Sequence, residues 1–281
     1  MPRRETHIPR IGELEVFSQQ RTSGRDQGPL DYHSISDVEP VWITLESALD
    51  VALCLHETPE GIQALTDLGV LIVQGLFRLG NGHTFGNRNM SEMRRHVILF
   101  LQIVRRRFPQ VYIRSSGRSD AITDRRMWGT DVDDYDPKVA ARFYVRDWIV
   151  DEVIRDPSRA NIFKFHLVIA LAHEIVHLFV GYLTGDPNVL TPPNLSARGH
   201  GSSTAGESGN YWERTFLGGT LEMWFPRGSV EAPGSAHAYL LLETSRGPRM
   251  ARRISPTYID NMVNRREYRV QGRAAQCCSK F

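Results

Sequence analysis

The chain is predicted to fold as an α+β domain with one long central helix, a small mixed sheet and an added N-terminal layer of helices. Apolar residues recur at helical spacing over much of residues 46 to 108, and an almost wholly apolar segment spans residues 162 to 183. Short segments typical of strands occur on both sides of that segment. With 281 residues, of which 41% are hydrophobic, the chain can bury a substantial core.

Three regions are expected along the chain. Residues 1–38 are polar and contain Gly24, Gly28 and Pro29, which predicts a poorly ordered arm or a wrapping segment. Residues 39–113 form a helical layer, with helices at about 46–54, 59–79 and 90–108. Residues 114–281 form the third region and make one compact domain with the preceding layer. This region begins with a polar stretch from 114 to 138, a spacer that separates the helical layer from the segments that follow.

The elements of the second half follow in order. Residues 139–146 alternate as a strand does, and the free edge of that strand could align an extended peptide. The alternative is an ordinary sheet with Arg142 and Arg146 on its solvated face. A short helix is expected over 147–155, strands over 220–225 and 238–243, and a closing helix near 256–265.

The long apolar segment carries the motif His173-Glu174-Ile175-Val176-His177 and should end at Gly185, with Pro187 just beyond. Residues four apart share one face of a helix, so both imidazoles can bind one metal ion, while Glu174 can accept a proton from a metal-bound water. If these polar groups were buried without partners, the free-energy cost would be roughly several kcal/mol, and a bound metal ion would remove that cost. The alternative to a metal site is a helix whose two histidines form hydrogen bonds with neighbouring residues and whose Glu174 forms an ion pair with an arginine.

A third ligand is expected downstream, where His200, Glu207 and Glu213 are the candidates. Glu207 ranks first and Glu213 second. Glu213 could instead accept a hydrogen bond from one of the histidines and hold that ring in place.

The expected position of Glu207 is in the first turns of a helix capped by Ser203 or Thr204. Gly206 and Gly209 flank Glu207 and would let this helix approach the histidine helix closely.

An open, catalytic zinc site is favoured over a closed structural one. A structural site uses four protein ligands, often cysteines, but Cys54 is far from the motif, and Cys277 and Cys278 lie in the last five residues. Zn²⁺ is the default ion, although imidazole and carboxylate ligands also suit iron, nickel and manganese. His166 lies about 10 Å before His173 along the helix and is expected to be a buried, hydrogen-bonded histidine.

Residues 140 to 220 resemble the zincin metallopeptidases of the gluzincin type, with HEIVH as the first two ligands and GESGNYWE as the third-ligand helix. Including Thr191-Pro192-Pro193 and residues 216–219, the chain is similar to uncharacterised fungal HExxH proteins, a resemblance that implies no known substrate. The tripeptide Gly199-His200-Gly201 looks like the third-ligand region of SprT-like proteases. His200 is therefore a candidate metal ligand, a candidate oxyanion donor or an exposed loop residue.

These observations predict a zinc-dependent hydrolase, most simply a metallopeptidase. Glu174 would be the general base and acid, and His200 or Tyr211 would stabilise the oxyanion. Two alternatives stay open: a metal-dependent small-molecule hydrolase or lyase in a biosynthetic pathway, and a catalytically inactive zincin-like binding protein.

The expected partner is a peptide or small-molecule substrate. The formal net charge is +2, from 34 basic and 32 acidic residues, and no basic groove interleaved with aromatics is visible, so nucleic-acid binding is not favoured. No signal peptide or transmembrane segment is expected. Three cysteines without a disulfide pattern fit an intracellular, cytoplasmic protein. The oligomeric state is left open.

Overall fold

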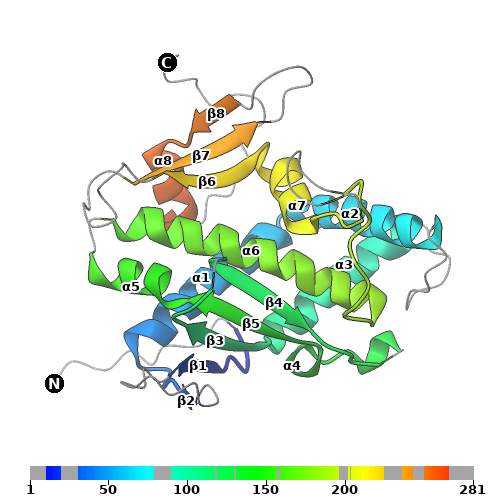
Figure 1. Cartoon of the computed structure of the whole chain (residues 1–281), viewed down its shortest axis with the longest axis horizontal. Helices are drawn as coiled ribbons and strands as arrows, with labels where there is room; N and C mark the ends of the chain where they lie inside the picture. Colours follow the sequence, from blue (N-terminus) through cyan, green and yellow to red (C-terminus); the bar gives the residue numbers. More distant parts are fainter. Residues whose placement is uncertain are drawn as a thin grey trace.

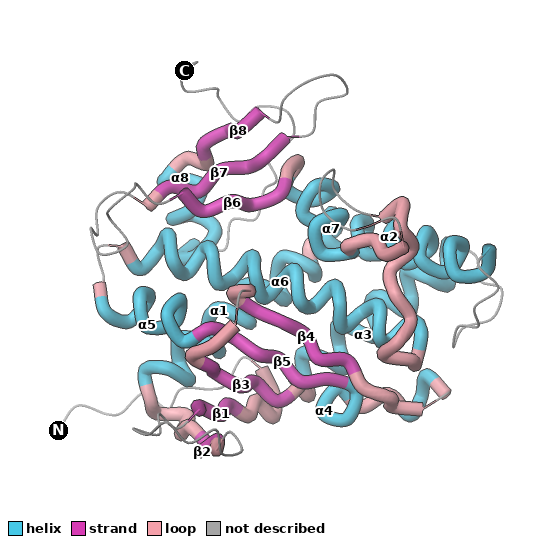
Figure 2. The backbone as a smooth tube through the Cα atoms, viewed as in Figure 1, coloured by secondary structure: helices cyan, strands magenta, loops and turns pink. Residues whose placement is uncertain are grey.

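The computed structural model describes residues 11–19, 31–78, 90–117, 119–129, 131–156, 159–195, 202, 204–224, 236–242 and 250–265. It has a mixed α+β architecture built around one central helix, α6 (Ala160–Thr184). Figure 1 shows α6 crossing the middle of the molecule, with a larger sheet on one side and a smaller sheet together with α7 on the other. The two sheets stand out in Figure 2 as separate groups of strands.

The larger sheet has five strands in the order β2-β1-β3-β5-β4. The three inner strands, β1 (Val16–Gln19), β3 (Gln110–Arg114) and β5 (Ala141–Arg146), run parallel to one another. The edge strands β2 (Tyr32–Ser34) and β4 (Ala121–Arg125) pair antiparallel with their neighbours. The predicted small mixed sheet is therefore confirmed, and β4 packs alongside α6 (Figure 1).

The predicted N-terminal helices are confirmed as α1 (Pro40–Glu57), α2 (Pro59–Arg78) and α3 (Met90–Arg106). The hydroxyl of Thr58 accepts a hydrogen bond from Gly61 N–H and so caps the start of α2, whose first residue is Pro59. The predicted helix after the strand is α5 (Asp147–Arg155), and two short elements, η1 (Val132–Asp134) and α4 (Pro137–Ala140), precede β5.

Helix α6 is the core of the molecule. Most of its residues are buried, and it packs against α1, α5, α7 and β4. It ends where predicted, because Gly185 takes the left-handed conformation at φ 68° and its N–H bonds the carbonyl of Gly181. By length and composition α6 could cross a membrane, but 83% of its most apolar window is buried inside the protein, as expected of a core helix.

The smaller sheet is antiparallel, in the order β6-β7-β8, with β6 (Thr220–Trp224), β7 (His237–Leu242) and β8 (Met250–Arg253). Helix α7 (Ser208–Leu217) leads into β6, and α8 (Pro256–Asp260) with the π-helical turn η2 (Asn261–Arg265) follows β8. The strands predicted at 220–225 and 238–243 and the closing helix are thus confirmed within a few residues.

One expectation about the larger sheet was wrong. The strand predicted over 139–146 is β5, which begins at Ala141. It lies between β3 and β4, so it has no free edge. The edge strand on this side of the sheet is β4, which lies inside the stretch interpreted as a polar spacer. Within the polar arm predicted over residues 1–38, residues 16–19 and 32–34 form β1 and β2 and belong to the sheet.

The face of the sheet opposite α6 carries the alternating polar residues. Arg142 lies over the ring of Tyr112, 5.3 Å from its centroid, on the face opposite the buried Phe143. The interpretation of Arg142 as a residue on the outer face of an ordinary sheet is therefore the one the structure supports.

Candidate metal centre

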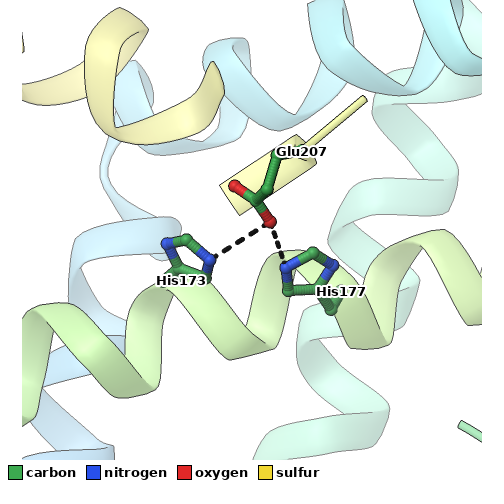
Figure 3. Close-up of side chains that lie close together, drawn as sticks. All are labelled: His173, His177 and Glu207. Atoms are coloured by element: carbon green, nitrogen blue, oxygen red, sulfur yellow. Dashed lines mark ion pairs between the residues drawn. The ribbon is translucent and has the colours of Figure 1, made fainter. Parts of the chain in front are cut away.

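Three side chains converge between α6 and α7 (Figure 3). The Oε1 atom of Glu207 lies 2.5 Å from Nε2 of His177 and 3.3 Å from Nε2 of His173. These three donor atoms lie within 4.8 Å of one another, which is close enough for all of them to bind one metal ion. The structure thus brings together the two histidines of the motif and the glutamate that ranked first as third ligand.

Glu207 reaches the histidines from a position that differs from the expected one. Helix α7 begins at Ser208, and Glu207 is its N-cap residue rather than a residue of its first turns. One carboxylate oxygen, Oε2, accepts a hydrogen bond from Asn210 N–H, while Oε1 faces the histidines. The hydrogen bond to the N-terminus of α7 therefore fixes the direction in which the Glu207 side chain points.

Of the two glycines that flank Glu207, Gly209 allows the close approach of α7 to α6 that was predicted, while Gly206 allows a close approach to another segment. A Cβ on Gly209 would lie 2.3 Å from Cδ2 and Nε2 of the His173 ring. A Cβ on Gly206 would lie 2.1 Å from the carbonyl oxygen of Pro192. Neither separation is possible for a real Cβ atom. Gly209 is therefore needed for α7 to lie this close to α6, and Gly206 is needed for the chain before α7 to lie this close to Pro192 in the loop that follows α6.

The other nitrogen of each histidine also has a partner. Nδ1 of His173 lies 2.6 Å from Oε1 of Glu213, and the second oxygen of Glu213 accepts a hydrogen bond from Leu221 N–H at 2.7 Å. Nδ1 of His177 lies 3.3 Å from the hydroxyl of Ser208. Glu213 therefore holds His173 rather than joining the metal-ligand group, which is the second of the two roles considered for it.

The charges at this centre are strongly coupled. Burial raises the pKa of the Glu207 carboxyl, but hydrogen bonds with His173 and His177 outweigh burial and hold that pKa well below its usual range. Burial lowers the pKa of His173, and the bonds to Glu207 and Glu213 outweigh it and raise that pKa well above the usual value. A positive charge is therefore stabilised among these groups, which is what a metal ion would supply.

Glu174 is 8% exposed, and its carboxylate faces β4. Its Oε2 atom accepts a hydrogen bond from the backbone N–H of Thr123 at 2.6 Å, and the hydroxyl of Thr123 donates to the carbonyl of Glu174 at 2.9 Å. The expected alternative of a glutamate paired with an arginine is not what the structure shows, since no arginine among the described residues lies within ion-pair distance of Glu174.

A cleft of about 770 Å³ runs along the centre. Its lining residues come mainly from β4, from α6, from α7 with the residue before it, and from β6. The lining residues include the three donors, Glu174 and Glu213, and also Asp120, Thr123, Arg125, His166, Asn210, Leu221 and Glu222. The described part of the chain therefore places the three candidate donors on the wall of a cleft that an edge strand borders.

Other predicted site residues have different positions. His200 lies outside the described residues. Tyr211, proposed as an oxyanion donor, is not among the described residues that line the cleft, and its ring packs beneath Arg214, 4.9 Å from the guanidinium carbon. His166 is buried, with Nε2 3.0 Å from Oδ2 of Asp120, which confirms the expectation of a buried, hydrogen-bonded histidine.

Sequence reasoning missed several residues near the centre. Thr123 and Asp120 come from the stretch interpreted as a polar spacer, and Asn210 lies within the GESGNYWE segment without having been singled out. His56 of α1 is fully buried behind α6, where its Nε2 donates to the carbonyl of Ala172 at 2.9 Å and its ring lies 4.6 Å from that of Trp212. An isolated histidine in an apolar helix gives no signal of such a contact.

Comparisons with models of known protein families, with curated proteins and with solved structures found no match to this chain.

Proposed function

We propose that this protein is a zinc-dependent hydrolase, and that its substrate is a peptide whose amide bond is cleaved with Glu174 as general base and acid. The observation that carries the proposal is the convergence of His173, His177 and Glu207 on one point in the wall of the cleft, with Glu174 beside them. Two imidazoles and one carboxylate are the ligand set of hydrolytic zinc sites that keep a position open for water.

The donor set fits zinc on chemical grounds. It offers two nitrogen atoms and one oxygen atom, without a thiolate, and each histidine has a hydrogen-bond partner at its other nitrogen. His173, His177 and Glu207 would hold the ion, and Glu213 and Ser208 would orient the rings. When bound, the ion would supply Lewis-acid chemistry, polarising a carbonyl group and lowering the pKa of water.

Glu174 would carry the proton transfers. Its carboxylate follows His173 directly on α6 and lines the cleft, so it is placed to accept a proton from the attacking water and to pass it to the leaving nitrogen. Asn210 also lines the cleft and offers a side-chain amide that can donate to the substrate.

The border of the cleft favours an extended substrate over a compact one. Strand β4 lies at the edge of the sheet and lines the cleft over most of its length. A peptide can pair with a free strand edge through backbone hydrogen bonds. The likeness to zincins is also supported by a mixed sheet with an antiparallel edge strand beside the HExxH helix, and by a later helix whose N-cap residue, Glu207, is the proposed third ligand.

The test is a hydrolysis assay on the zinc-loaded protein with a peptide library, read by mass spectrometry. We expect cleavage that a chelator abolishes and that Glu174→Gln reduces roughly 100- to 10,000-fold, the usual contribution of general acid–base catalysis. Glu222→Gln, which changes a glutamate elsewhere on the cleft wall, is the matched control and should keep its activity. Cleavage that persists at full rate in Glu174→Gln would contradict the proposal.

A further inference from the structure

Thr123 makes two hydrogen bonds to Glu174 that join the edge strand to the proposed general base. The N–H of Thr123 donates to Oε2 of the carboxylate at 2.6 Å, and its hydroxyl donates to the backbone carbonyl of Glu174 at 2.9 Å. A hydrogen bond to a carboxylate is stronger than one between neutral groups, so this contact fixes the carboxylate firmly.

The direction of the Thr123 N–H follows from the pairing of β4 with β5. Asp120 and Arg126, at the two ends of the ladder, bond to Arg146 and Ala140 and so face β5. Alternate residues of an antiparallel strand point their backbone groups to opposite sides. The N–H groups of Ala121, Thr123 and Arg125 therefore point to the free edge, and the bond to Glu174 uses no group that the sheet needs.

The bond also decides where the carboxylate of Glu174 lies. The group of donor atoms within 4.8 Å of one another contains His173, His177 and Glu207 but not Glu174, although Glu174 is next to His173 in the helix. The Thr123 N–H thus holds the carboxylate toward the strand. A fourth protein ligand would turn an open site into a closed one, which is the difference between catalytic and structural zinc sites.

We infer that Thr123 is a positioning residue whose backbone N–H keeps the carboxylate of Glu174 out of the metal's coordination sphere and so preserves one open position. The inference rests on the proposed metal site, and it adds a residue that acts on the metal only through Glu174. It predicts that losing this N–H lets Glu174 bind the metal and occupy the open position.

The test uses Thr123→Pro, which removes the N–H at a position where no ladder bond is lost and where edge strands accept proline. Ala121→Pro is the matched control, because the N–H of Ala121 also points to the free edge but has no bond to Glu174. Thr123→Val keeps the N–H and loses the hydroxyl, so it separates the two hydrogen bonds.

The readout is the binding of azide to the cobalt(II)-substituted proteins, followed by visible absorption. Azide enters only an open position. We expect it to bind wild type, Ala121→Pro and Thr123→Val alike, and to bind Thr123→Pro about tenfold or more weakly, in the range typical of changes to groups that orient metal ligands. The double variant Thr123→Pro with Glu174→Ala should bind azide again, because the blocking carboxylate is gone.

Unchanged azide binding in Thr123→Pro would overturn the inference, as would a double variant that fails to recover. Should Thr123→Pro not fold, amide hydrogen exchange on folded protein tests the hydrogen bond on which the inference rests. The Thr123 amide should exchange slowly in wild type and fast in Glu174→Ala, whereas fast exchange in wild type would refute the anchor. If wild type takes up no metal, the proposed function fails, and the exchange result still stands by itself.

Discussion

At the scale of single residues, the carboxylate of Glu213 shows how a residue outside the candidate ligand set can hold a candidate ligand in place. One oxygen contacts His173, and the other accepts the N–H of Leu221 at the start of β6. Glu213 is 5% exposed, so its two partners replace the water that it loses on folding. A buried glutamate with both oxygens occupied by protein orients a histidine more firmly than a solvated one could.

Glu213→Gln should weaken zinc binding by about 10- to 100-fold, because an amide cannot accept from both His173 and Leu221 in the way the carboxylate does. The measurement is a competition titration with a chelating dye. Glu222→Gln, on the same cleft but without contact to a histidine, should leave the zinc affinity unchanged. Equal affinity in wild type and Glu213→Gln would show that His173 needs no orientation.

His56 predicts a pH dependence of stability. Burial lowers its pKa from 6.5 to about 4, with the bond to Ala172 acting in the opposite direction. Between pH 6.5 and 4 the unfolded chain therefore binds a proton that the folded chain does not, so stability falls as the pH falls. The loss from this residue amounts to roughly 3 kcal/mol at the acid end.

Denaturant unfolding of wild type and His56→Phe at pH 7 and pH 4 measures this contribution. The wild type should lose roughly 3 kcal/mol more than the variant over that range, since the other titrating groups are shared. The same loss in both proteins would mean that His56 is not the titrating group.

The sequence predicts some residues of the candidate centre and misses others. His173 and His177 follow from their spacing on an apolar helix, and Glu207 follows from its glycine neighbours. Thr123 could not be found in this way, because its role depends on a strand lying beside α6, and that pairing joins residues 51 positions apart. Residues that act through long-range contacts, and a backbone N–H above all, leave no local pattern.

At the scale of elements, the approach of α7 to α6 determines whether the donors meet. Gly209 sits where any side chain would enter the His173 ring. At the other end of α7, Gly218 has a positive φ of 82° but open space around it. The first glycine is required by contact and the second by backbone conformation, which gives a matched pair of substitutions.

Gly209→Ala should abolish or strongly weaken zinc binding and lower stability by about 1–3 kcal/mol, the usual cost of overpacking. Gly218→Ala should lower stability by roughly 1 kcal/mol through strain in the left-handed region, with zinc affinity intact. Zinc titration together with thermal unfolding separates the two effects. Normal zinc affinity in Gly209→Ala would contradict the close approach of the helices.

The elements themselves were predicted well where periodicity is local. The helices α1, α2, α3, α5 and α6 were all expected from the sequence, with boundaries that differ from the predicted ones by up to six residues, at the start of α1. Strand positions in the sheet were not, because the order β3-β5-β4 depends on partners distant in the chain. The edge strand β4 reads as a polar spacer since only one of its faces packs against α6, and Ile122 and Asp124 are exposed.

At the scale of the whole molecule, one hydrophobic core joins the N-terminal helices to α6 and α7. The contact of His56 with Ala172 and Trp212 belongs to this core, and Ala172 is the residue next to the candidate ligand His173. The helical layer expected over residues 39–113 therefore supports the back of the candidate centre.

Because the ligands come from two elements of this shared core, metal binding should stabilise the whole fold. At a free zinc concentration of about 100 times its dissociation constant, the free energy of unfolding should rise by roughly 2.7 kcal/mol. Thermal or denaturant unfolding with and without zinc measures this. His173→Ala should show no such rise, and an equal rise in that variant would place the zinc elsewhere.

The metal content of the purified protein, measured by elemental mass spectrometry beside His173→Ala and Glu207→Ala, tests the central claim most directly. The account predicts about one zinc per wild-type chain and its loss in both variants, since each removes one of three protein ligands. No metal in the wild type, even after zinc is supplied, or full zinc in Glu207→Ala, would contradict it.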